Sequence, residues 1–140
     1  MNILTLEEKQ QITLSFSLLK NAKTNIAKSF YDNLFEMAPL VKPMFTSERE
    51  TIENHFYELI NSAVDNINNF SAIRPHLFDL GYQHKAYGVR EHHFTVVKAA
   101  FILSIQYNLK GQFHDALEVA WSKYFDELSQ VMIEGLRSHK

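Results

Sequence analysis

Cysteine is absent from this chain, and the residues that most often interrupt helices are scarce, with four glycines and three prolines among 140 residues. Without cysteine there is no disulfide framework, which suits a reducing compartment. The scarcity of glycine and proline favours a mostly helical protein. No run of about 18 apolar residues occurs, and no basic stretch precedes an apolar one at the N-terminus. We therefore expect a cytoplasmic protein with neither a transmembrane helix nor a signal peptide.

An excess of charge of one sign is lacking as well. The sequence carries 14 Lys and Arg against 16 Asp and Glu, which gives a formal charge of −2. This balance gives no electrostatic reason to expect nucleic acid or an anionic membrane as a partner, so neither is predicted. The length fits one domain over residues 1–140, large enough to bury a core without metal or disulfide cross-links.

Aromatic residues, in contrast, are abundant. They make up 13% of the sequence and include eleven phenylalanines. Large flat side chains of this kind can fill the core of a helical bundle, or they can line a pocket for a flat, apolar group. The composition alone leaves both interpretations open.

Apolar periodicity and helix-end signals predict an all-α chain of about six helices joined by short connections. Three segments with capping-box spacing are expected to open helices, at Thr5–Glu8, Ser47–Glu50 and Asp115–Glu118. The remaining helices are predicted over Thr24–Met37, from Pro75 to about Tyr87, and over Glu91–Asn108. Pro39 and Pro43 predict an irregular corner after the second helix, and Gly88 is expected to close the fourth.

The histidines can be tested for a metal site by their spacing, because a helical zinc pair needs ligands on one face. The seven histidines stand at positions 55, 76, 84, 92, 93, 114 and 139, and no two are three or four residues apart. Structural zinc is therefore not expected. Neither a G-x-S-x-G motif nor a glycine-rich loop occurs, which argues against a serine nucleophile and against phosphate binding.

His84 differs from the other histidines in its surroundings. Leu77, Leu80 and Gly81 precede it at helical spacing, so the ring is expected on the apolar face of its helix. A polar ring there needs a backbone carbonyl or a metal as partner. A metal held by a single histidine needs other ligands, and a haem macrocycle supplies four nitrogens itself. A flat pocket for haem would also account for the aromatic excess.

Three segments resemble globins, specifically single-domain bacterial haemoglobins and the globin module of flavohaemoglobins. The segment "SFYDNLFEMAPLVKPMF" resembles the family's second helix and corner, "DLGYQHKAYGV" its proximal segment, and "AWSKYFDEL" its last helix. The resemblance covers nearly the whole chain. It implies the globin fold, a sandwich of three helices over three with six to seven helices, and haem b as cofactor. It also implies Tyr31 as the distal tyrosine, Phe45 stacked on the haem, and His84 as the iron ligand.

The same resemblance predicts the other residues of the haem pocket. Besides Tyr31 and His84, the expected lining consists of Phe45, Ile52, His55, Phe56, Leu80, Tyr87, Val89, Phe94 and Val97. On the third helix, Ile52 falls where related proteins often carry a polar residue facing the ligand, and Phe56 is the next inward residue. His55 lies about 60° around the helix from Ile52. It either binds iron as a distal ligand or faces solvent at the haem edge.

On the proximal side, flavohaemoglobins hold the imidazole with a tyrosine and a glutamate. The matching positions here are Phe94 and Leu136, which cannot accept a hydrogen bond, and Glu134 is expected to face elsewhere. The second nitrogen of His84 is predicted to bond the carbonyl of Leu80, one turn back. We therefore expect a weakly donating imidazole and low peroxidase activity.

The remaining histidines are assigned to surfaces or helix ends. His92, His93 or Arg90 could contact a haem propionate, because they are expected where a helix begins near the haem edge. His76, His114 and His139 are predicted to be exposed or to lie at helix termini.

Two functions of different classes follow from these expectations. The first is a haem globin that binds O₂, NO or a similar small ligand. It would act as a carrier or convert NO to nitrate, and turnover would need an external electron donor or reductase, because no reductase module is present. The second is a haem-free, globin-like sensor or adaptor that acts through protein contacts. A plain helical interaction bundle would leave Tyr31, Phe45 and His84 unexplained.

Overall fold

The computed structural model describes residues 4–21 and 25–138, and helices account for most of them. The all-α expectation is confirmed. Thr24, expected to start the second helix, and His139 lie outside the described residues. The α-helices are α1 (Leu6–Asn21), α2 (Ile26–Met37), α3 (Arg49–Asp65), α4 (Arg74–His84), α5 (His93–Leu109) and α6 (Asp115–Arg137), and the 3₁₀ helices are η1 (Pro39–Met44), η2 (Phe70–Ala72), η3 (Lys85–Tyr87) and η4 (Lys110–Gln112).

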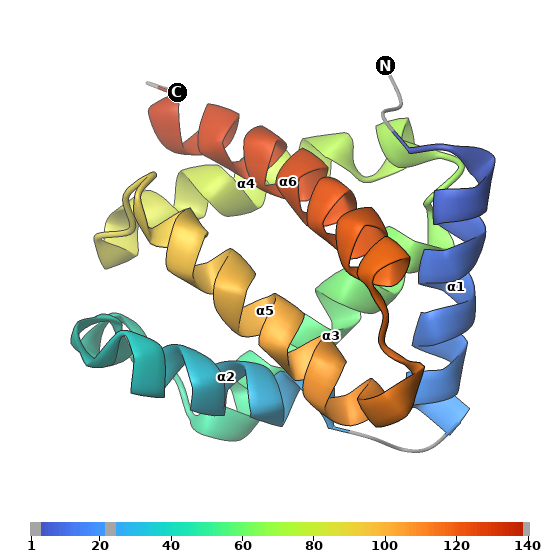
Figure 1. The fold of residues 1–140 in the computed structure, drawn as a ribbon. Coiled ribbons are helices and arrows are strands. Elements are labelled where there is room, and N and C mark those ends of the chain that lie inside the picture. The colour runs from blue at the N-terminus through green and yellow to red at the C-terminus, as the bar shows by residue number, and fades with distance from the viewer. Residues whose placement is uncertain (1–3, 22–24, 139–140) are drawn as a thin grey trace.

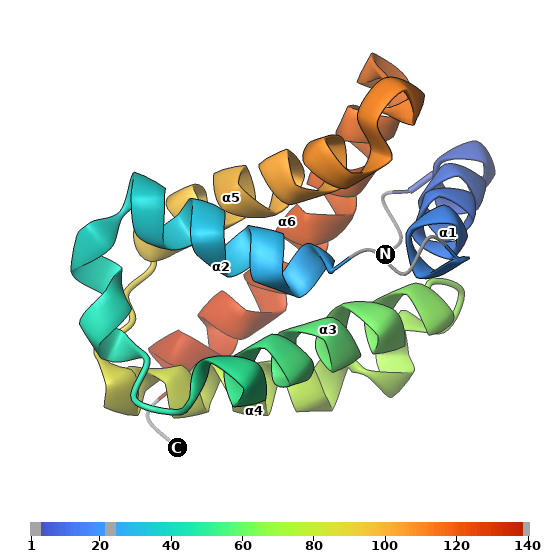
Figure 2. The same ribbon diagram turned by 90° about the horizontal axis from the view of Figure 1, so that it is seen from below.

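The helices form two layers that cross one another (Figure 1). Seen from below, α3 and α4 lie on one side of the molecule, while α2 and α5 lie on the other (Figure 2). The most extensive contacts between helices join α4 to α6 and α2 to α5, and α1 contacts α3, α5 and α6. Because α3 follows α2 through the η1 corner, the residues of both helices are brought together at that end of the sandwich.

The expected helix starts are confirmed at one of three places. Thr5 caps α1 as predicted: its hydroxyl accepts from the Glu8 N–H at 3.0 Å, and the Glu8 carboxylate accepts from the Thr5 N–H at 2.9 Å. The box at Ser47 is wrong, because α3 begins at Arg49 and no side chain caps it. The box at Asp115 is also wrong, because His114 is the N-cap of α6 and its Nδ1 accepts from the Leu117 N–H at 3.3 Å.

The corners follow the proline and glycine positions. Pro39 and Pro43 lie in η1, whose 3₁₀ turns replace a further turn of α2. After α4, the chain makes one 3₁₀ turn and reaches Gly88, which adopts the left-handed conformation with φ 84°. Since a side chain disfavours this conformation, glycine ends the α4–η3 segment as expected.

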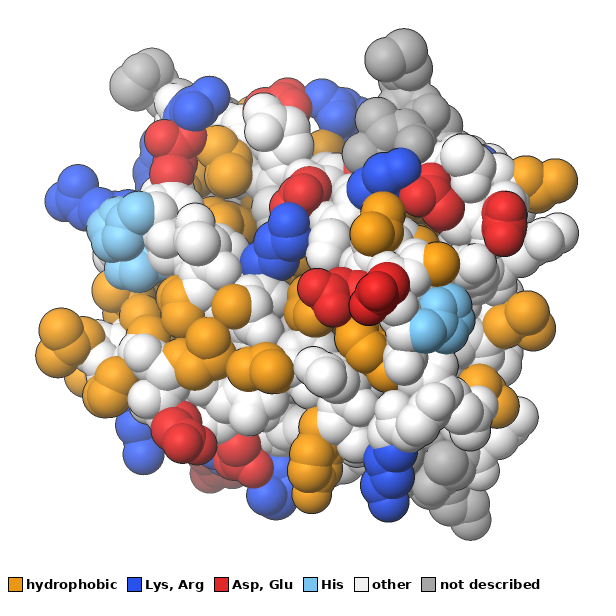
Figure 3. All heavy atoms as spheres, in the orientation of Figure 1, with side chains coloured by type: hydrophobic (Ala, Val, Ile, Leu, Met, Phe, Trp, Pro, Cys, Tyr) orange, Lys and Arg blue, Asp and Glu red, His pale blue; other side chains and the backbone are white. Residues whose placement is uncertain are grey.

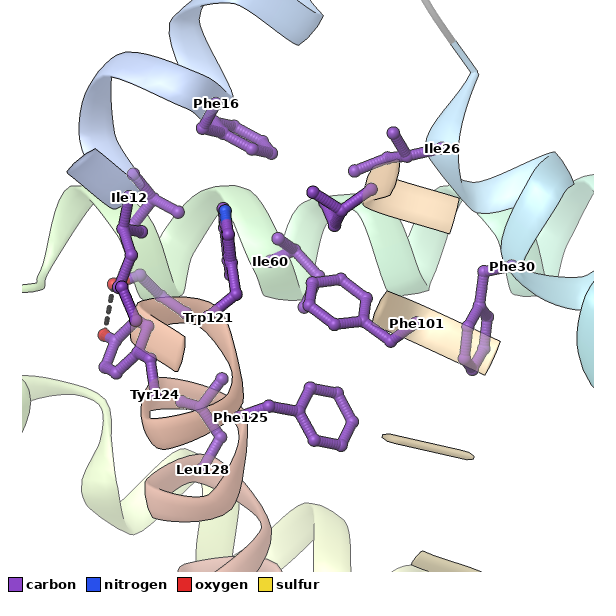
Figure 4. Close-up of a cluster of buried hydrophobic side chains, with 14 of the residues drawn as sticks. Ile12, Phe16, Ile26, Phe30, Ile60, Phe101, Trp121, Tyr124, Phe125 and Leu128 are labelled. Carbon is purple, nitrogen blue, oxygen red and sulfur yellow. Dashed lines mark hydrogen bonds between the residues drawn. The ribbon is translucent and has the colours of Figure 1, made fainter. Parts of the chain in front are cut away.

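The core is built from aromatic and branched side chains of all six α-helices, and Figure 4 shows part of it. Of these residues, Figure 4 labels Ile12, Phe16, Ile26, Phe30, Ile60, Phe101, Trp121, Tyr124, Phe125 and Leu128. Phe101 packs edge-on against Trp121, with 5.4 Å between ring centroids, and stacks on Phe125 at 5.0 Å. Full burial of one such side chain contributes about 1.5–3 kcal/mol. The core therefore supplies much of the stabilising free energy.

Two polar atoms within this core have partners. The Trp121 indole N–H donates to the Ser15 hydroxyl at 2.9 Å, and the Tyr124 hydroxyl donates to the Ala63 carbonyl at 2.5 Å. The second bond is the dashed line in Figure 4. Each bond joins α6 to another helix, and each avoids the cost of an unpaired buried donor.

Two glycines allow α4 and α6 to approach backbone to backbone. A Cβ atom on Gly81 would lie 1.9 Å from the Met132 carbonyl oxygen, and one on Gly135 would lie 2.0 Å from that of Phe78. Both distances are far below van der Waals contact, and backbone atoms cannot rotate away. The close crossing of α4 and α6 therefore requires glycine at both positions. His84 is the last residue of α4, so this crossing also helps to position it.

We expect Gly135→Ala to destabilise the protein by about 1–3 kcal/mol, because the added methyl group must push α4 away from α6. The gain in helix propensity, about 1 kcal/mol, opposes this but does not remove the clash. Urea unfolding measures the difference. Gly111→Ala is the matched control, since a Cβ there meets no atom within 4 Å. Equal stability of the two variants would contradict the assigned crossing.

The surface carries charges of both signs together with apolar patches. On the face shown in Figure 3, Lys and Arg lie beside Asp and Glu, and hydrophobic side chains gather over the α2–α5 side. None of the helices in the described part of the chain combines the length and apolar character that a bilayer crossing requires.

Candidate functional site

Tyr31, on the inner face of α2, is the centre of an aromatic cluster. The Phe45 ring meets it edge-on at 5.4 Å, the Phe56 ring meets it edge-on at 5.9 Å, and Phe35 lies at 5.7 Å. Phe45 follows the η1 corner, so the corner returns the chain to the end of α2. The structure thus brings together Tyr31, Phe45 and Phe56, which the sequence had placed in one pocket.

The Tyr31 hydroxyl is a buried donor with a weak partner. The side chain is 6% exposed, and its hydroxyl lies 3.5 Å from the carbonyl oxygen of Ile52, the upper limit for a hydrogen bond. Burial raises the pKa of Tyr31 well above its ordinary value, while nearby Arg49 opposes the rise. The phenol is therefore protonated at neutral pH and can donate to a group that approaches it.

The two sides of α3 differ in their surroundings. Phe56 stacks on the Phe30 ring with 4.1 Å between centroids, and Ile52 is half-buried with its carbonyl towards Tyr31. The side of α3 that carries Ile52 and Phe56 therefore packs against α2. His55 lies about 60° further around the helix and is exposed. Its imidazole is consequently outside the packed interface.

His84 is the last residue of α4 and is half-buried. Its Nδ1 lies 2.5 Å from the carbonyl oxygen of Leu80, so the predicted hydrogen bond is present. A carbonyl can only accept, and Nδ1 must therefore carry the proton. In the neutral imidazole this arrangement leaves the lone pair on Nε2, and that tautomer is the one able to bind a metal through Nε2. The Val89 N–H donates to the His84 carbonyl at 3.3 Å and ties the following turn to the helix.

The other predicted lining residues are mostly half-buried. Leu80 on α4, Val89 in the turn, and Phe94 and Val97 on α5 are each partly accessible, whereas Tyr87 is 53% exposed. The Tyr87 ring meets the His84 ring edge-on, with 6.4 Å between centroids. Apolar side chains left partly accessible beside a histidine with a free ring nitrogen suit contact with an apolar ligand.

The surroundings of α6 near His84 agree with the expected apolar proximal side. Glu134 pairs with Arg74 at 2.9 Å, so its carboxylate is directed towards the start of α4. Leu136 is 9% exposed and lies where an apolar residue was expected. The shallow pocket beside it is lined mostly by charged residues, namely Lys85, Arg90, Glu91 and Arg137. Within the described ranges, no carboxylate forms a hydrogen bond with His84. The sequence prediction for Glu134 is therefore confirmed.

The histidines at the start of α5 have different environments. The His93 Nδ1 accepts from the Arg90 N–H at 2.9 Å, which closes the turn before the helix. Burial, with smaller effects of His92 and Arg90, lowers the pKa of His93. The His92 and His93 rings lie 4.2 Å apart. Arg90, Glu91 and His92 are exposed at this corner, and Glu91 pairs with Arg137.

His76 and His114 lie away from these regions, at the places that the sequence predicts for them. His76 is exposed on α4 and His114 is exposed as the N-cap of α6, as their assignment to surfaces and helix ends predicts. Among the residues that the structure describes, no group of three His, Asp or Glu side chains could hold a metal ion.

The sequence patterns did not indicate Arg49, a residue that lies beside the site. Arg49, the first residue of α3, pairs with Asp32 at 2.7 Å and with Glu53 at 2.6 Å. Its guanidinium carbon lies 5.7 Å from the Tyr31 ring centroid. The spacing of Arg49 and Glu53 predicts a contact within one helix, but no local pattern predicts the contact with α2.

A family model described as Globin matches residues 28–132. A protein named anaerobic nitrite reductase from Oryza sativa subsp. indica is 27% identical, and the match covers 94% of this chain and 95% of the relative. A protein of the same name from Gossypium hirsutum is 25% identical, with 90% of this chain and 86% of the relative covered. The matches thus extend over nearly the full length of these relatives.

Solved structures share the fold. The engineered carbene transferase RmaNOD from Rhodothermus marinus superimposes with a TM-score of 0.86 at 21% identity, covering 95% of this chain and 93% of that one. A hexacoordinated heme protein from an anhydrobiotic tardigrade gives 0.83 at 19% identity, covering 98% and 97%. A bacterial globin from Campylobacter jejuni gives 0.79 at 25% identity, covering 95% and 96%. With the family model spanning more than half of its length, this chain belongs to the globin family.

Proposed function

We propose that this protein binds haem b through His84 and uses it to bind O₂, NO or a related small ligand. The observation that carries the proposal is the hydrogen bond between His84 Nδ1 and the Leu80 carbonyl. This bond fixes the tautomer and the ring orientation and leaves Nε2 free to bind iron. With no cysteine in the chain, covalent attachment through thioethers is excluded, which favours haem b over haem c.

The residues around His84 fit a haem group in their chemistry. Leu80, Val89, Phe94 and Val97 offer half-buried apolar surface on α4, the following turn and α5. Phe45 meets Tyr31 edge-on at the η1 corner, where the family places the ring that stacks on haem. Exposed Arg90 and His92 provide cationic or donor groups for the propionates, whereas His93 Nδ1 is already engaged by the Arg90 N–H.

Haem would supply an iron that binds small ligands and the electron-transfer chemistry that converts nitrogen oxides. Tyr31 would donate a hydrogen bond to the bound ligand, because its protonated hydroxyl has only a 3.5 Å contact with Ile52. Ile52 and Phe56 would keep water from the distal side, since they close the interface between α2 and α3. The absence of a carboxylate hydrogen bond to His84 in the described chain favours reversible ligand binding over peroxidase chemistry.

Turnover on nitrogen oxides would require electrons from an external donor or reductase. Relatives at 25–27% identity bear the name anaerobic nitrite reductase. These names favour nitrite reduction beside conversion of NO to nitrate as candidate activities. The proposed roles are the same for both reactions: His84 binds the haem, Tyr31 contacts the ligand, and a separate protein delivers electrons.

We further propose His55 as a second, distal ligand that competes with the external one. Its exposed imidazole lies about 60° around α3 from Ile52, so a small rotation or shift of this helix would bring it towards the iron. Imidazole is a good iron ligand where it can reach the metal. Competition from His55 would lower the apparent affinity for O₂ in proportion to the fraction of open protein.

The absorption spectrum tests these proposals. The purified protein should show a Soret band and a pyridine haemochrome of the b type. In the ferrous form without added ligand it should be six-coordinate and low-spin, and His55→Leu should convert it to five-coordinate. His92→Leu, which alters another exposed histidine, should leave the spectrum unchanged. A five-coordinate wild type would exclude His55 as a ligand.

A preparation without a Soret band, even after reconstitution with haem, would favour the alternative of a haem-free sensor or adaptor. That alternative predicts no dependence of any binding activity on His84 or Tyr31. The optical spectrum therefore separates the two classes of function in one measurement.

A further inference from the structure

Arg49 joins the start of α3 to α2 through several contacts at once. Its Nη2 donates to Asp32 Oδ1 at 2.7 Å and to the carbonyl oxygen of Lys28 at 3.1 Å, both on α2. Its Nε donates to Glu53 Oε2 at 2.6 Å, one turn further along α3. Charge-assisted hydrogen bonds from a planar guanidinium fix orientation as well as distance.

The first turn of α3 depends on these contacts because it lacks the usual cap. Glu48 occupies the N-cap position, and its side chain accepts no hydrogen bond from the turn. By contrast, α1 and α2 have side-chain caps from Thr5 and Asn25. A helix start without a side-chain cap is the part of a helix most prone to fraying. The Arg49 contacts therefore hold this turn in place from α2.

The same guanidinium lies against the ring of Tyr31. Its carbon is 5.7 Å from the Tyr31 centroid and 5.6 Å from that of Phe35, within the range of cation–π attraction. The turn that Arg49 begins also carries Ile52, whose carbonyl oxygen contacts the Tyr31 hydroxyl. Arg49 thus contacts the aromatic face of Tyr31 and fixes the backbone that faces its hydroxyl.

His55 follows on the same helix. It lies six residues after Arg49, which corresponds to about 9 Å along the axis. A short helical segment moves as a unit, so a shift of the first turn of α3 would change the reach of His55.

We propose that Arg49 is a positioning residue that clamps the first turn of α3 onto α2 and thereby sets how Tyr31 and His55 are presented to an iron-bound ligand. This inference rests on the proposed haem function. Arg49 itself contacts neither haem nor ligand in this assignment, and its effect is transmitted through Tyr31 and the α3 backbone.

The first experiment uses the protein without added haem, because the Arg49 contacts involve residues of this chain alone. In Arg49→Gln, the Ile52 N–H, which donates to the Glu48 carbonyl, and the hydrogen-bonded amides of the following turn should exchange with deuterium at least about tenfold faster, equivalent to about 1.4 kcal/mol of local stability. Asp32→Asn should act similarly. The double variant should exchange little faster than either single variant, because both substitutions remove the same Arg49–Asp32 ion pair. The ¹⁹F resonance of 3-fluorotyrosine at position 31 should shift in each variant.

Arg74→Gln provides the matched control. Arg74 also begins a helix, pairs with a carboxylate of another helix at 2.9 Å, and is similarly exposed, at 49% against 40% for Arg49. This control should accelerate exchange in α4 but leave the Tyr31 resonance unchanged. Unchanged exchange in α3 and an unchanged Tyr31 resonance in Arg49→Gln would overturn the proposal.

The second experiment uses the haem-loaded protein. Arg49→Gln should change the ferrous six-coordinate fraction and the O₂ dissociation rate by roughly threefold or more, and it should shift the C–O stretching band of the carbonmonoxy form. Arg49→Lys keeps the positive charge but lacks the planar guanidinium with its several N–H donors. It should therefore restore the wild-type values only in part. Wild-type coordination and kinetics in Arg49→Gln would reduce the residue to a structural role and overturn the proposal. Failure of the wild type to take up haem would refute the proposed function. The deuterium exchange and the ¹⁹F resonance, measured without haem, would still show whether Arg49 holds the first turn of α3 against α2.

Discussion

Replacing His84 with glycine is expected to lower haem affinity by roughly tenfold or more, a loss of at least about 1.4 kcal/mol. The reason is that, among the described histidines, His84 has its Nδ1 held by a backbone carbonyl, and this contact orients the ring for metal binding through Nε2. Haem transfer to an acceptor globin measures the loss. Added imidazole should enter the vacated space and restore the ferrous spectrum of a histidine-ligated haem.

The control for this change is His76→Gly. His76 lies on the same helix and is exposed, so it has the same cost in helix propensity without contact to the site. It should retain haem as the wild type does. A His84→Gly variant with the wild-type ferrous spectrum in the absence of imidazole would show that another residue binds the iron.

Replacing Tyr31 with phenylalanine should speed O₂ dissociation by about ten- to a hundredfold. The hydroxyl is a buried donor whose only close acceptor among the described residues is the Ile52 carbonyl at 3.5 Å, so little is lost within the protein. A bond to a charged or strongly polarised ligand contributes roughly 1.5–3 kcal/mol, and 1.4 kcal/mol corresponds to one decade. Stopped-flow displacement of O₂ by CO measures the rate.

Tyr124→Phe separates this effect from a general loss of stability. Tyr124 is also buried, but its hydroxyl donates to the Ala63 carbonyl in the core at 2.5 Å. Its removal should lower the free energy of unfolding by about 1 kcal/mol and leave O₂ dissociation unchanged. Tyr31→Phe should show the opposite pattern. An unchanged O₂ dissociation rate in Tyr31→Phe would mean that the phenol points away from the ligand.

Features encoded over a few residues could be read from the sequence. The periodic apolar positions of α1 and α6 predict their buried faces, and Ile12, Phe16, Trp121 and Tyr124 are buried accordingly. The capping pair Thr5–Glu8 and the stop at Gly88 are likewise local. The bond from His84 to Leu80 was predictable for the same reason, since both residues lie one turn apart on a single helix.

Two helix starts could not be predicted, because more than one nearby residue can cap a helix. Ser47 and Asp115 have the right side chains and spacing, yet α3 and α6 begin at Arg49 and Asp115 with Glu48 and His114 as their caps. A shift of one or two residues changes which side chain faces the free N–H groups. The backbone conformation of the preceding corner, rather than the local motif, decides which of these residues becomes the N-cap.

By itself, the sequence determined the all-α class, the apolar faces of α1 and α6, and the hydrogen bond from His84 to the Leu80 carbonyl. Only the tertiary structure decided that the Phe56 ring stacks on Phe30 of α2 and that the His55 side chain is exposed. It also decided that Arg49 reaches Asp32, and that Gly135 meets the backbone of Phe78. These contacts join residues on different helices. Their geometry depends on how the helices cross, which no periodicity within one helix specifies.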